Sequence, residues 1–107
     1  WLFEGTLPHL NLGTVEGHSC APALRQALIA AMATQQRFTH VTDGRFKGGH
    51  ITRHYGQPLH GVHAVQLEMC WRAYMDEAPP SWNDERAAEV TPLLKTLVRT
   101  MLEWSPR

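Results

Sequence analysis

The chain has 107 residues, the size of one ordinary domain, and 43% of them are apolar, which is enough to bury a core. Ten Lys and Arg side chains balance ten Asp and Glu side chains, so no overall positive charge favours nucleic acid or an anionic membrane. No apolar run approaches the roughly 18 residues that a membrane-spanning helix needs. We therefore expect a globular domain that binds neither nucleic acid nor membrane.

The first predicted elements are a strand and a helix. Residues 10–14 alternate apolar and polar side chains and lead into a loop, which is typical of a short strand. Ser19 suits an N-cap and Pro22 suits a first helical turn, so we predict a helix over about residues 20–36. Its apolar face consists of Leu24, Leu28, Ala31 and Met32.

Two further predicted strands flank a glycine-rich segment. Residues 38–44 predict a second strand that ends in an Asp-Gly turn, and residues 61–70 predict the third. Between them, Gly49 and Gly56 argue against a helix, so we expect an irregular loop there.

The C-terminal part predicts a long helix. Residues 71–82 begin with a helical pattern, which Pro79 and Pro80 break, and Asn83 or Ser81 then caps the last helix.

This last helix contains an apolar stripe and an internal proline. Pro92 removes a backbone donor and is expected to kink or restart the helix, with Thr91 as a new cap. The stripe consists of Val90, Leu94, Leu97, Met101 and Trp104. The alternation of strands and helices predicts an α/β layer architecture, and three strands leave exposed edges, which suggests that partner strands are missing.

The cysteines and histidines give weak signals. Cys20 and Cys70 follow no CxxC or zinc-finger spacing, so we expect two free, buried thiols rather than a disulfide or a nucleophile. The close histidine pairs have neither an HExxH context nor an obvious third ligand, so we expect no complete metal site among them. These pairs are His50 with His54 and His60 with His63.

Positive charge is concentrated in one segment. Residues 44–67 contain no acid but include Arg45, Lys47 and Arg53, whereas acids dominate from Asp76 onward. A glycine-rich cationic segment suits a small anion, and Arg can bind a carboxylate through two parallel hydrogen bonds. The alternative is a solvated loop whose cations pair with the acidic C-terminal part.

Glu68 is the one charge in the third predicted strand. Burial favours the neutral form of a carboxyl group, which can make it a general acid or base near neutrality. The alternative is a strand-end carboxylate that pairs with a nearby Arg or His. Thr14, the cationic segment and Glu68 each follow or end a predicted strand, and ligands of open α/β sheets gather at the carboxyl ends of strands. We therefore expect the three to converge.

Three segments together resemble a known enzyme family. They are "LNLGTVEGHSCAPAL", "DGRFKGGHITRHYGQP" and "GVHAVQLEMCWRAYMDE". Over roughly residues 3–104 the chain resembles the C-terminal portion of the N-formylglutamate deformylase family, also called N-formylglutamate amidohydrolase. The resemblance implies a cytoplasmic enzyme that hydrolyses N-formyl-L-glutamate to formate and L-glutamate, late in one route of histidine degradation.

The resemblance also implies a fold and a metal. The family's fold is similar to that of zinc-dependent carboxypeptidases (phosphorylase/hydrolase-like), with a mixed sheet flanked by helices. Its zinc is bound by two His and one Glu, expected in an H-x-x-E-type motif and an Asp-x-His-Ser segment, and neither precedes the matched motifs here. We therefore expect residues 1–107 to be a single domain or a fragment, with the zinc ligands in an N-terminal part of the same protein.

Site roles follow from the same resemblance. Glu68 corresponds to the proton shuttle, and the cationic segment would neutralise the two carboxylates of the substrate. The residues expected to bind the substrate are Arg45, Lys47, His50, Arg53 and Thr14. Two alternatives stay open: a domain that binds small dicarboxylates without catalysis, and a related N-acyl-amino-acid amidohydrolase.

Overall fold

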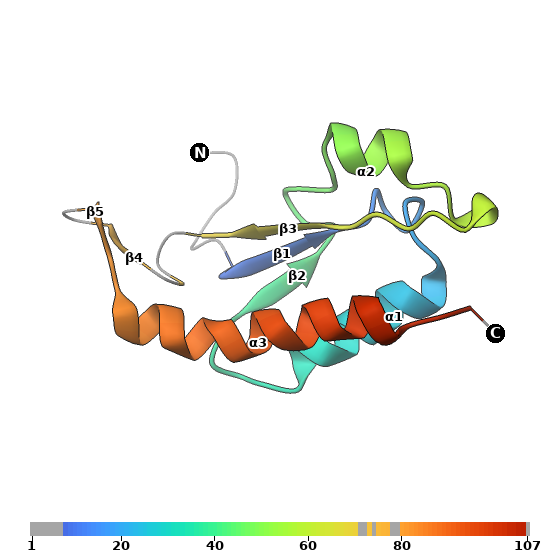
Figure 1. The fold of residues 1–107 in the computed structure, drawn as a ribbon. Helices are drawn as coiled ribbons and strands as arrows, with labels where there is room; N and C mark the ends of the chain where they lie inside the picture. The colour runs from blue at the N-terminus through green and yellow to red at the C-terminus, as the bar shows by residue number, and fades with distance from the viewer. Residues whose placement is uncertain (1–7, 71–72, 74, 78–79, 107) are drawn as a thin grey trace.

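The fold is a small mixed sheet with two long helices on one side (Figure 1). The computed structural model describes residues 8–70, 73, 75–77 and 80–106. In the sheet, β1 (Leu10–Gly13) lies between β2 (His40–Thr42), which is parallel to it, and β3 (Gln66–Met69), which is antiparallel. The predicted α/β class is confirmed, although β2 and β3 are shorter than the patterns predicted.

The register of β3 corrects the expected convergence at the carboxyl ends of the strands. Because β3 is antiparallel to β1, Gln66 lies opposite Gly13 and Glu68 lies opposite Asn11. Gln66, rather than Glu68, is therefore the β3 residue nearest the carboxyl end of β1. Thr14 follows that end and does meet the residue after β2, as expected for parallel neighbours.

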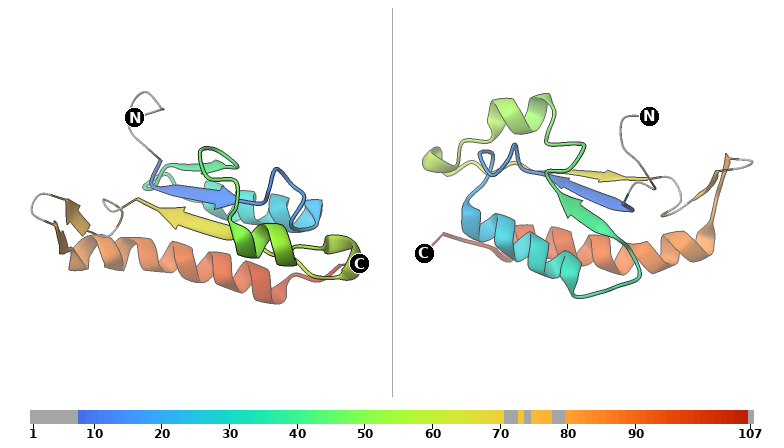
Figure 2. Two further views of the ribbon diagram at one scale, coloured as in Figure 1. Left: turned by 90° about the horizontal axis from the view of Figure 1, so that it is seen from above. Right: turned by 180° about the vertical axis from the view of Figure 1, so that it is seen from behind.

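Helices α1 (Pro22–Ala33) and α3 (Asp84–Glu103) lie side by side against one face of the sheet (Figure 2). The start of α1 differs from the prediction, because Ala21 rather than Ser19 is the N-cap. The Ser19 hydroxyl instead donates to the carbonyl oxygen of Ala64 at 2.6 Å. Nδ1 of His63 accepts from the Ala21 amide at 3.0 Å. A side chain that is distant in the sequence therefore provides the hydrogen-bond acceptor for a backbone amide at the start of α1.

Helix α3 begins at the predicted cap but is not interrupted. The Asn83 side chain accepts from the Arg86 amide at 3.0 Å. The helix continues through Pro92, and Thr91 is not a new cap, because its hydroxyl donates within the helix to Ala87 at 2.6 Å. Leu93 is buried in addition to the predicted stripe, and the predicted Leu94 is partly buried and packs against the core.

Two segments fold differently from the prediction. Residues His50–Tyr55 form the short helix α2, because the glycines at positions 49 and 56 flank this helix instead of interrupting it. A 3-10 turn follows at Pro58–His60. The expected helical start before the last helix is replaced by a hairpin of β4 (Met75–Glu77) and β5 (Pro80–Trp82). The prediction for Pro79 lies outside the described residues.

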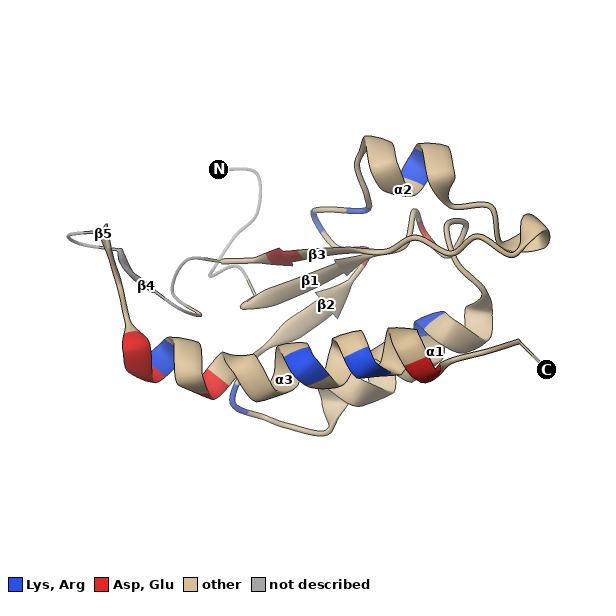
Figure 3. Ribbon diagram, viewed as in Figure 1, with Lys and Arg blue, Asp and Glu red and all other residues tan. Residues whose placement is uncertain are grey.

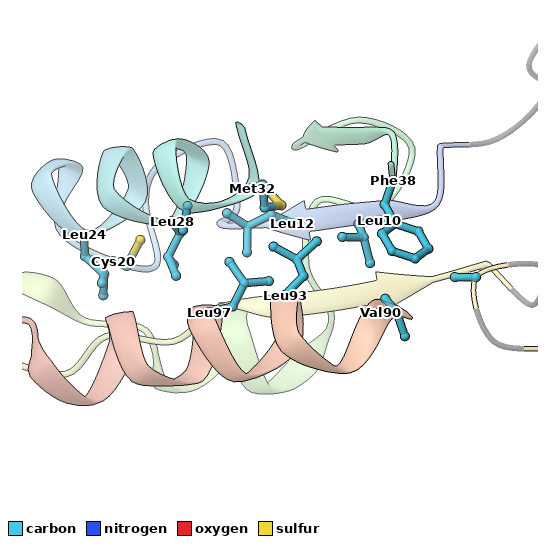
Figure 4. Packing of buried hydrophobic residues seen from close by; sticks show 12 residues of the cluster. Leu10, Leu12, Cys20, Leu24, Leu28, Met32, Phe38, Val90, Leu93 and Leu97 are labelled. Carbon is cyan, nitrogen blue, oxygen red and sulfur yellow. The ribbon is translucent and has the colours of Figure 1, made fainter. Parts of the chain in front are cut away.

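Helix α2 lies on the face of the sheet opposite α1 and α3, and Lys and Arg mark α2 and the loop before it (Figure 3). The apolar core lies on the other face, between the sheet and the two long helices (Figure 4). Cys20 is buried in this core and Cys70 is half-buried, and both are free, as predicted. Burial raises the pKa of the Cys20 thiol, which opposes its use as a nucleophile. None of the described helices is long and apolar enough to cross a membrane.

Candidate active site

The two faces of the sheet differ sharply in chemistry. Along β1, Leu10 and Leu12 are buried in the core, whereas the intervening Asn11 turns its side chain to the opposite face. Along β3, the side chains of Gln66 and Glu68 lie on that same face, joined by a hydrogen bond. The sheet therefore presents a polar face on the side away from α1 and α3.

A loop of residues 43–49, which we call the cationic loop, is held over this polar face. The Asn11 side chain forms hydrogen bonds with both backbone groups of Phe46, at 2.5 Å to the carbonyl oxygen and 3.3 Å from the amide. The Val15 amide donates to the carbonyl oxygen of Lys47 at 2.6 Å. The cationic loop is thus fixed to β1 and to the turn that follows it.

Glycine is required within the cationic loop. Gly48 has a φ of 138°, which L side chains rarely adopt, and a Cβ atom there would collide with the Thr52 hydroxyl. The sharp bend lets the backbone pass directly into α2, where the Thr52 hydroxyl donates to the carbonyl oxygen of Gly49 at 2.9 Å.

A cavity of about 340 Å³ lies between the cationic loop, α2 and β3. Its lining residues are Arg45, Phe46, Lys47, Gly48, Gly49, Arg53 and Gln66. Three of the five residues expected to bind the substrate thus line one cavity. A volume of this size suits a small molecule.

The cations of the cavity differ in their partners. Nε of Arg53 donates to the carbonyl oxygen of Gly48 at 3.0 Å, and no described residue engages its two terminal nitrogens. Nζ of Lys47 lies 2.6 Å from a carboxylate oxygen of Glu16, and both side chains are exposed. The hydrogen bond and charge of Lys47 lower the pKa of Glu16. Lys47 therefore pairs with Glu16, which precedes the cationic loop in the sequence, and not with an acid of the C-terminal part.

Glu68 is connected to the cavity through the side chain of Gln66, which lines the cavity wall. Nε2 of Gln66 donates to Oε1 of Glu68 at 2.7 Å, and Oε1 of Gln66 accepts from the Gly49 amide at 2.7 Å. The half-buried Glu68 is thus linked to the cationic loop by a single amide group. The Gly49 amide is therefore not available to a ligand, because it already donates to Gln66.

Thr14 is not part of the cavity, and its side chain is completely buried. Its hydroxyl donates to Oδ2 of Asp43 at 2.5 Å, and its amide donates to Oδ1 at 2.7 Å. Nε of Arg25 donates to the Thr14 hydroxyl, and its Nη2 lies 3.0 Å from Oδ2 of Asp43. Partial burial raises the pKa of Asp43, but the hydrogen bonds from Thr14 and Arg25 outweigh it and hold the pKa below its ordinary value.

His50 also lies away from the cavity lining. It is exposed at the start of α2, where its ring stacks on that of His54 with centroids 5.1 Å apart. Sequence reasoning missed Gln66, Asp43 and Arg25. The spacing of two between Gln66 and Glu68 in a strand was a usable signal for one of them.

No three His, Cys, Asp or Glu side chains among the described residues are grouped so that they could hold a metal ion. The described residues therefore form no zinc site by themselves, and the resemblance places the zinc ligands in an N-terminal part of the same protein.

Comparison with known proteins agrees with the resemblance in sequence. A family model described as N-formylglutamate amidohydrolase matches residues 1–75. The chain is 50% identical over 104 residues to the N-formylglutamate deformylase of Pseudomonas aeruginosa and 46% identical over 104 residues to that of Pseudomonas putida. Each alignment covers 96% of this chain and 39% of the relative, so the chain spans about two fifths of these curated relatives.

A solved structure shares the fold. The crystal structure of N-formylglutamate amidohydrolase from Ralstonia eutropha JMP134 aligns with 94% of this chain and 36% of its own, with a TM-score of 0.76 and 23% identity. The mixed sheet and its helices are therefore an arrangement found in an amidohydrolase. Because the family model matches residues 1–75, which is more than half of this chain, the chain belongs to the N-formylglutamate amidohydrolase family.

Proposed function

We propose that the full-length protein hydrolyses N-formyl-L-glutamate to formate and L-glutamate. This chain, as its C-terminal part, would supply a general acid/base, Glu68, and the substrate-binding cationic loop. The observation that carries the proposal is that Glu68 and the cavity with Lys47 and Arg53 share the polar face of the sheet, joined through Gln66. The family and the names of the relatives agree with this substrate.

The cations of the cavity suit a substrate with two carboxylates. The two terminal nitrogens of Arg53 present parallel donors that match a carboxylate. The exposed pair of Lys47 with Glu16 is weak in water, so a substrate carboxylate can replace Glu16 as the partner of Lys47. Arg45 supplies a third positive charge to the same wall.

The position of Glu68 suits proton transfer. Hydrolysis adds water to the formyl carbon, removes a proton from that water, and delivers a proton to the nitrogen as the C–N bond breaks. Gln66 holds Oε1 of Glu68, and no described residue bonds to Oε2. In the proposal, Oε2 accepts the proton from water and then donates it to the leaving nitrogen, which releases formate and L-glutamate.

The remaining parts of the proposal concern what lies outside the described residues. A zinc ion, bound by residues of an N-terminal part with a carboxypeptidase-like fold, would polarise the carbonyl group and activate water. The reaction would serve histidine degradation in the cytoplasm. We expect residues 1–107 alone to be inactive toward N-formylglutamate with added zinc, and turnover at the rate of the full-length enzyme would refute this division of the site.

The direct test is Glu68→Gln in the full-length protein. The amide keeps the shape of the side chain but cannot transfer the proton, so we expect kcat to fall by roughly 10²–10⁴ with KM changed much less. Formate release measures the rate. Glu103→Gln, which removes an exposed carboxylate from the end of α3, is the matched control. An unchanged kcat in Glu68→Gln would remove Glu68 from the mechanism.

The same cavity also fits a domain that binds dicarboxylates without catalysis. Calorimetry of the full-length protein with L-glutamate and with N-formylglutamate, each with and without zinc, separates the two functions. Metal-independent binding without formate release supports the binder. A panel of other N-acyl amino acids tests the related amidohydrolases, and the enzyme proposed here should prefer the formyl group and the second carboxylate.

A further inference from the structure

Gln66 connects two parts of the candidate site that the sequence places far apart. Its amide group accepts from the cationic loop at Gly49 and donates to the carboxylate of Glu68. We propose that Gln66 is a positioning residue, which orients Glu68 for proton transfer and makes that orientation depend on the cationic loop. This inference rests on the proposed function.

The chemistry of the partners fixes the orientation of the amide. The Gly49 amide can only donate, so the oxygen of Gln66 must face it, and the NH₂ group must then face Glu68. Both distances are 2.7 Å, which is short for hydrogen bonds of this type. The loop backbone, rather than the strand itself, thus determines which group Gln66 presents to the carboxylate.

The sheet register leaves space for this arrangement. Gln66 lies directly opposite Gly13, which has no side chain, so no cross-strand neighbour competes for the space on the polar face. A Cβ atom at Gly13 would lie 3.0 Å from the carbonyl carbon of Lys47. The glycine therefore lets the cationic loop come close enough to the strands for Gly49 to reach Gln66.

Two consequences follow for catalysis. The hydrogen bond from Gln66 restricts the rotation of the Glu68 side chain, so Oε2 is held in one direction to accept a proton. In addition, Gln66 lines the cavity beside Arg53, so a change in the cationic loop on binding is transmitted to Glu68 through one side chain.

The test uses two substitutions of similar length in the full-length protein. Gln66→Met removes both hydrogen bonds. Gln66→Glu keeps an acceptor for Gly49 but removes the donor to Glu68 and places two carboxylates side by side. We expect each to lower kcat at pH 8 by roughly 10- to 100-fold, because the reacting carboxylate is misplaced.

The pH dependence distinguishes positioning from a merely structural role. In Gln66→Glu, a proton bound between the two carboxyl groups restores a donor to Glu68, so kcat relative to the unsubstituted protein should rise as the pH falls from 8 to 6. Gln66→Met introduces no titratable group, so in this variant the ratio of its kcat to that of the unsubstituted protein should stay constant between pH 8 and 6. Gln26→Met and Gln26→Glu, at an exposed position of α1, are the matched controls and should leave kcat unchanged.

The outcomes separate this inference from the proposed function. If Glu68→Gln is inactive but both Gln66 substitutions keep the full kcat and the original pH profile, the positioning role is wrong and the proposed function stands. If Glu68→Gln keeps full kcat, the proposed function fails first. Should Gln66→Met not fold, Gln66→Glu still decides, because a ratio that stays constant or falls between pH 8 and 6 contradicts the inference.

Discussion

The two faces of the sheet have different roles: the apolar face packs in the core, and the polar face carries the candidate site. On the face toward α1 and α3, Leu10 and Leu12 are 0% and 2% exposed and belong to the core. On the opposite face, the neighbouring Asn11 holds the cationic loop, and Glu68 lies beside it across the strands. Successive side chains of a strand point to opposite faces of the sheet. Neighbouring residues of β1 can therefore have different roles, one in the stability of the core and the next in the candidate site.

The strongest test of this division is a substitution on the apolar face. Leu12→Ala removes a buried side chain from between the sheet and the helices, so we expect the free energy of unfolding to fall by about 2–5 kcal/mol. Urea unfolding of the full-length protein measures it. The control is Val98→Ala on α3, where the side chain is already exposed. It should change the free energy of unfolding by less than about 0.5 kcal/mol.

The division also predicts that Leu12→Ala leaves the chemistry intact. The kcat of the molecules that remain folded should stay within a few fold of the original value. A loss of kcat as large as that of Glu68→Gln would show that the two faces are not separable.

The next largest effect is expected where β1 and β2 end. Asp43→Asn removes the charge that Thr14 and Arg25 surround, and we expect a loss of about 1.5–3 kcal/mol in the free energy of unfolding at pH 7. Thermal or urea unfolding measures it. Asp84→Asn, an exposed change in the first turn of α3, should cost less than about 1 kcal/mol.

The Asp43→Asn difference should depend on pH in a defined direction. The pKa of Asp43 lies below its ordinary value of 3.8 in the folded chain, so its stabilisation is complete above that pH. It is lost as the pH falls through the lower folded pKa. The two proteins should therefore converge in stability below about pH 4, and a difference that grew on acidification would contradict the described hydrogen bonds.

A smaller effect is expected on substrate binding by the polar face. Arg53→Ala removes the two terminal nitrogens from the cavity, so we expect KM for N-formylglutamate to rise by about tenfold or more, with a smaller change in kcat. Steady-state kinetics measures both. Arg99→Ala, an exposed change on α3, should have no effect on KM, and an equal effect would show that only the overall charge matters.

The smallest effect is expected at the exposed ion pair. Glu16→Gln frees Lys47 from its partner, so KM should fall by less than about threefold, and added salt should abolish the difference. An increase in KM would mean that Glu16 orients Lys47 for the substrate instead of competing with it.

Local signals predicted the fold better than the site. Asn83 was predicted as a cap because its partner lies three residues away, and the strand–helix alternation predicted the α/β class. Ser19 was assigned wrongly because its partner, Ala64, is brought to it only by the fold. The short helix α2 was missed because flanking glycines were taken as interrupting ones.

The site shows the same limit. The cations and Glu68 were visible as unusual residues in their segments, and the structure gathers three of the cations at one cavity. The role of Thr14 was not visible, because its hydroxyl is occupied by Asp43, 29 residues later. Gln66 was missed because its importance depends on Gly49 and on the antiparallel register of β3, neither of which a single strand pattern determines.

We propose that the cationic loop and Glu68 form one substrate site on the polar face of the sheet. A crystal structure of the full-length Glu68→Gln variant with N-formylglutamate tests it most directly, because slow turnover preserves the substrate. We predict a substrate carboxylate at Arg53 and the formyl group within hydrogen-bond distance of the side chain at position 68. A substrate bound elsewhere, such as in the apolar cavity beside His18 and Leu59, would contradict it.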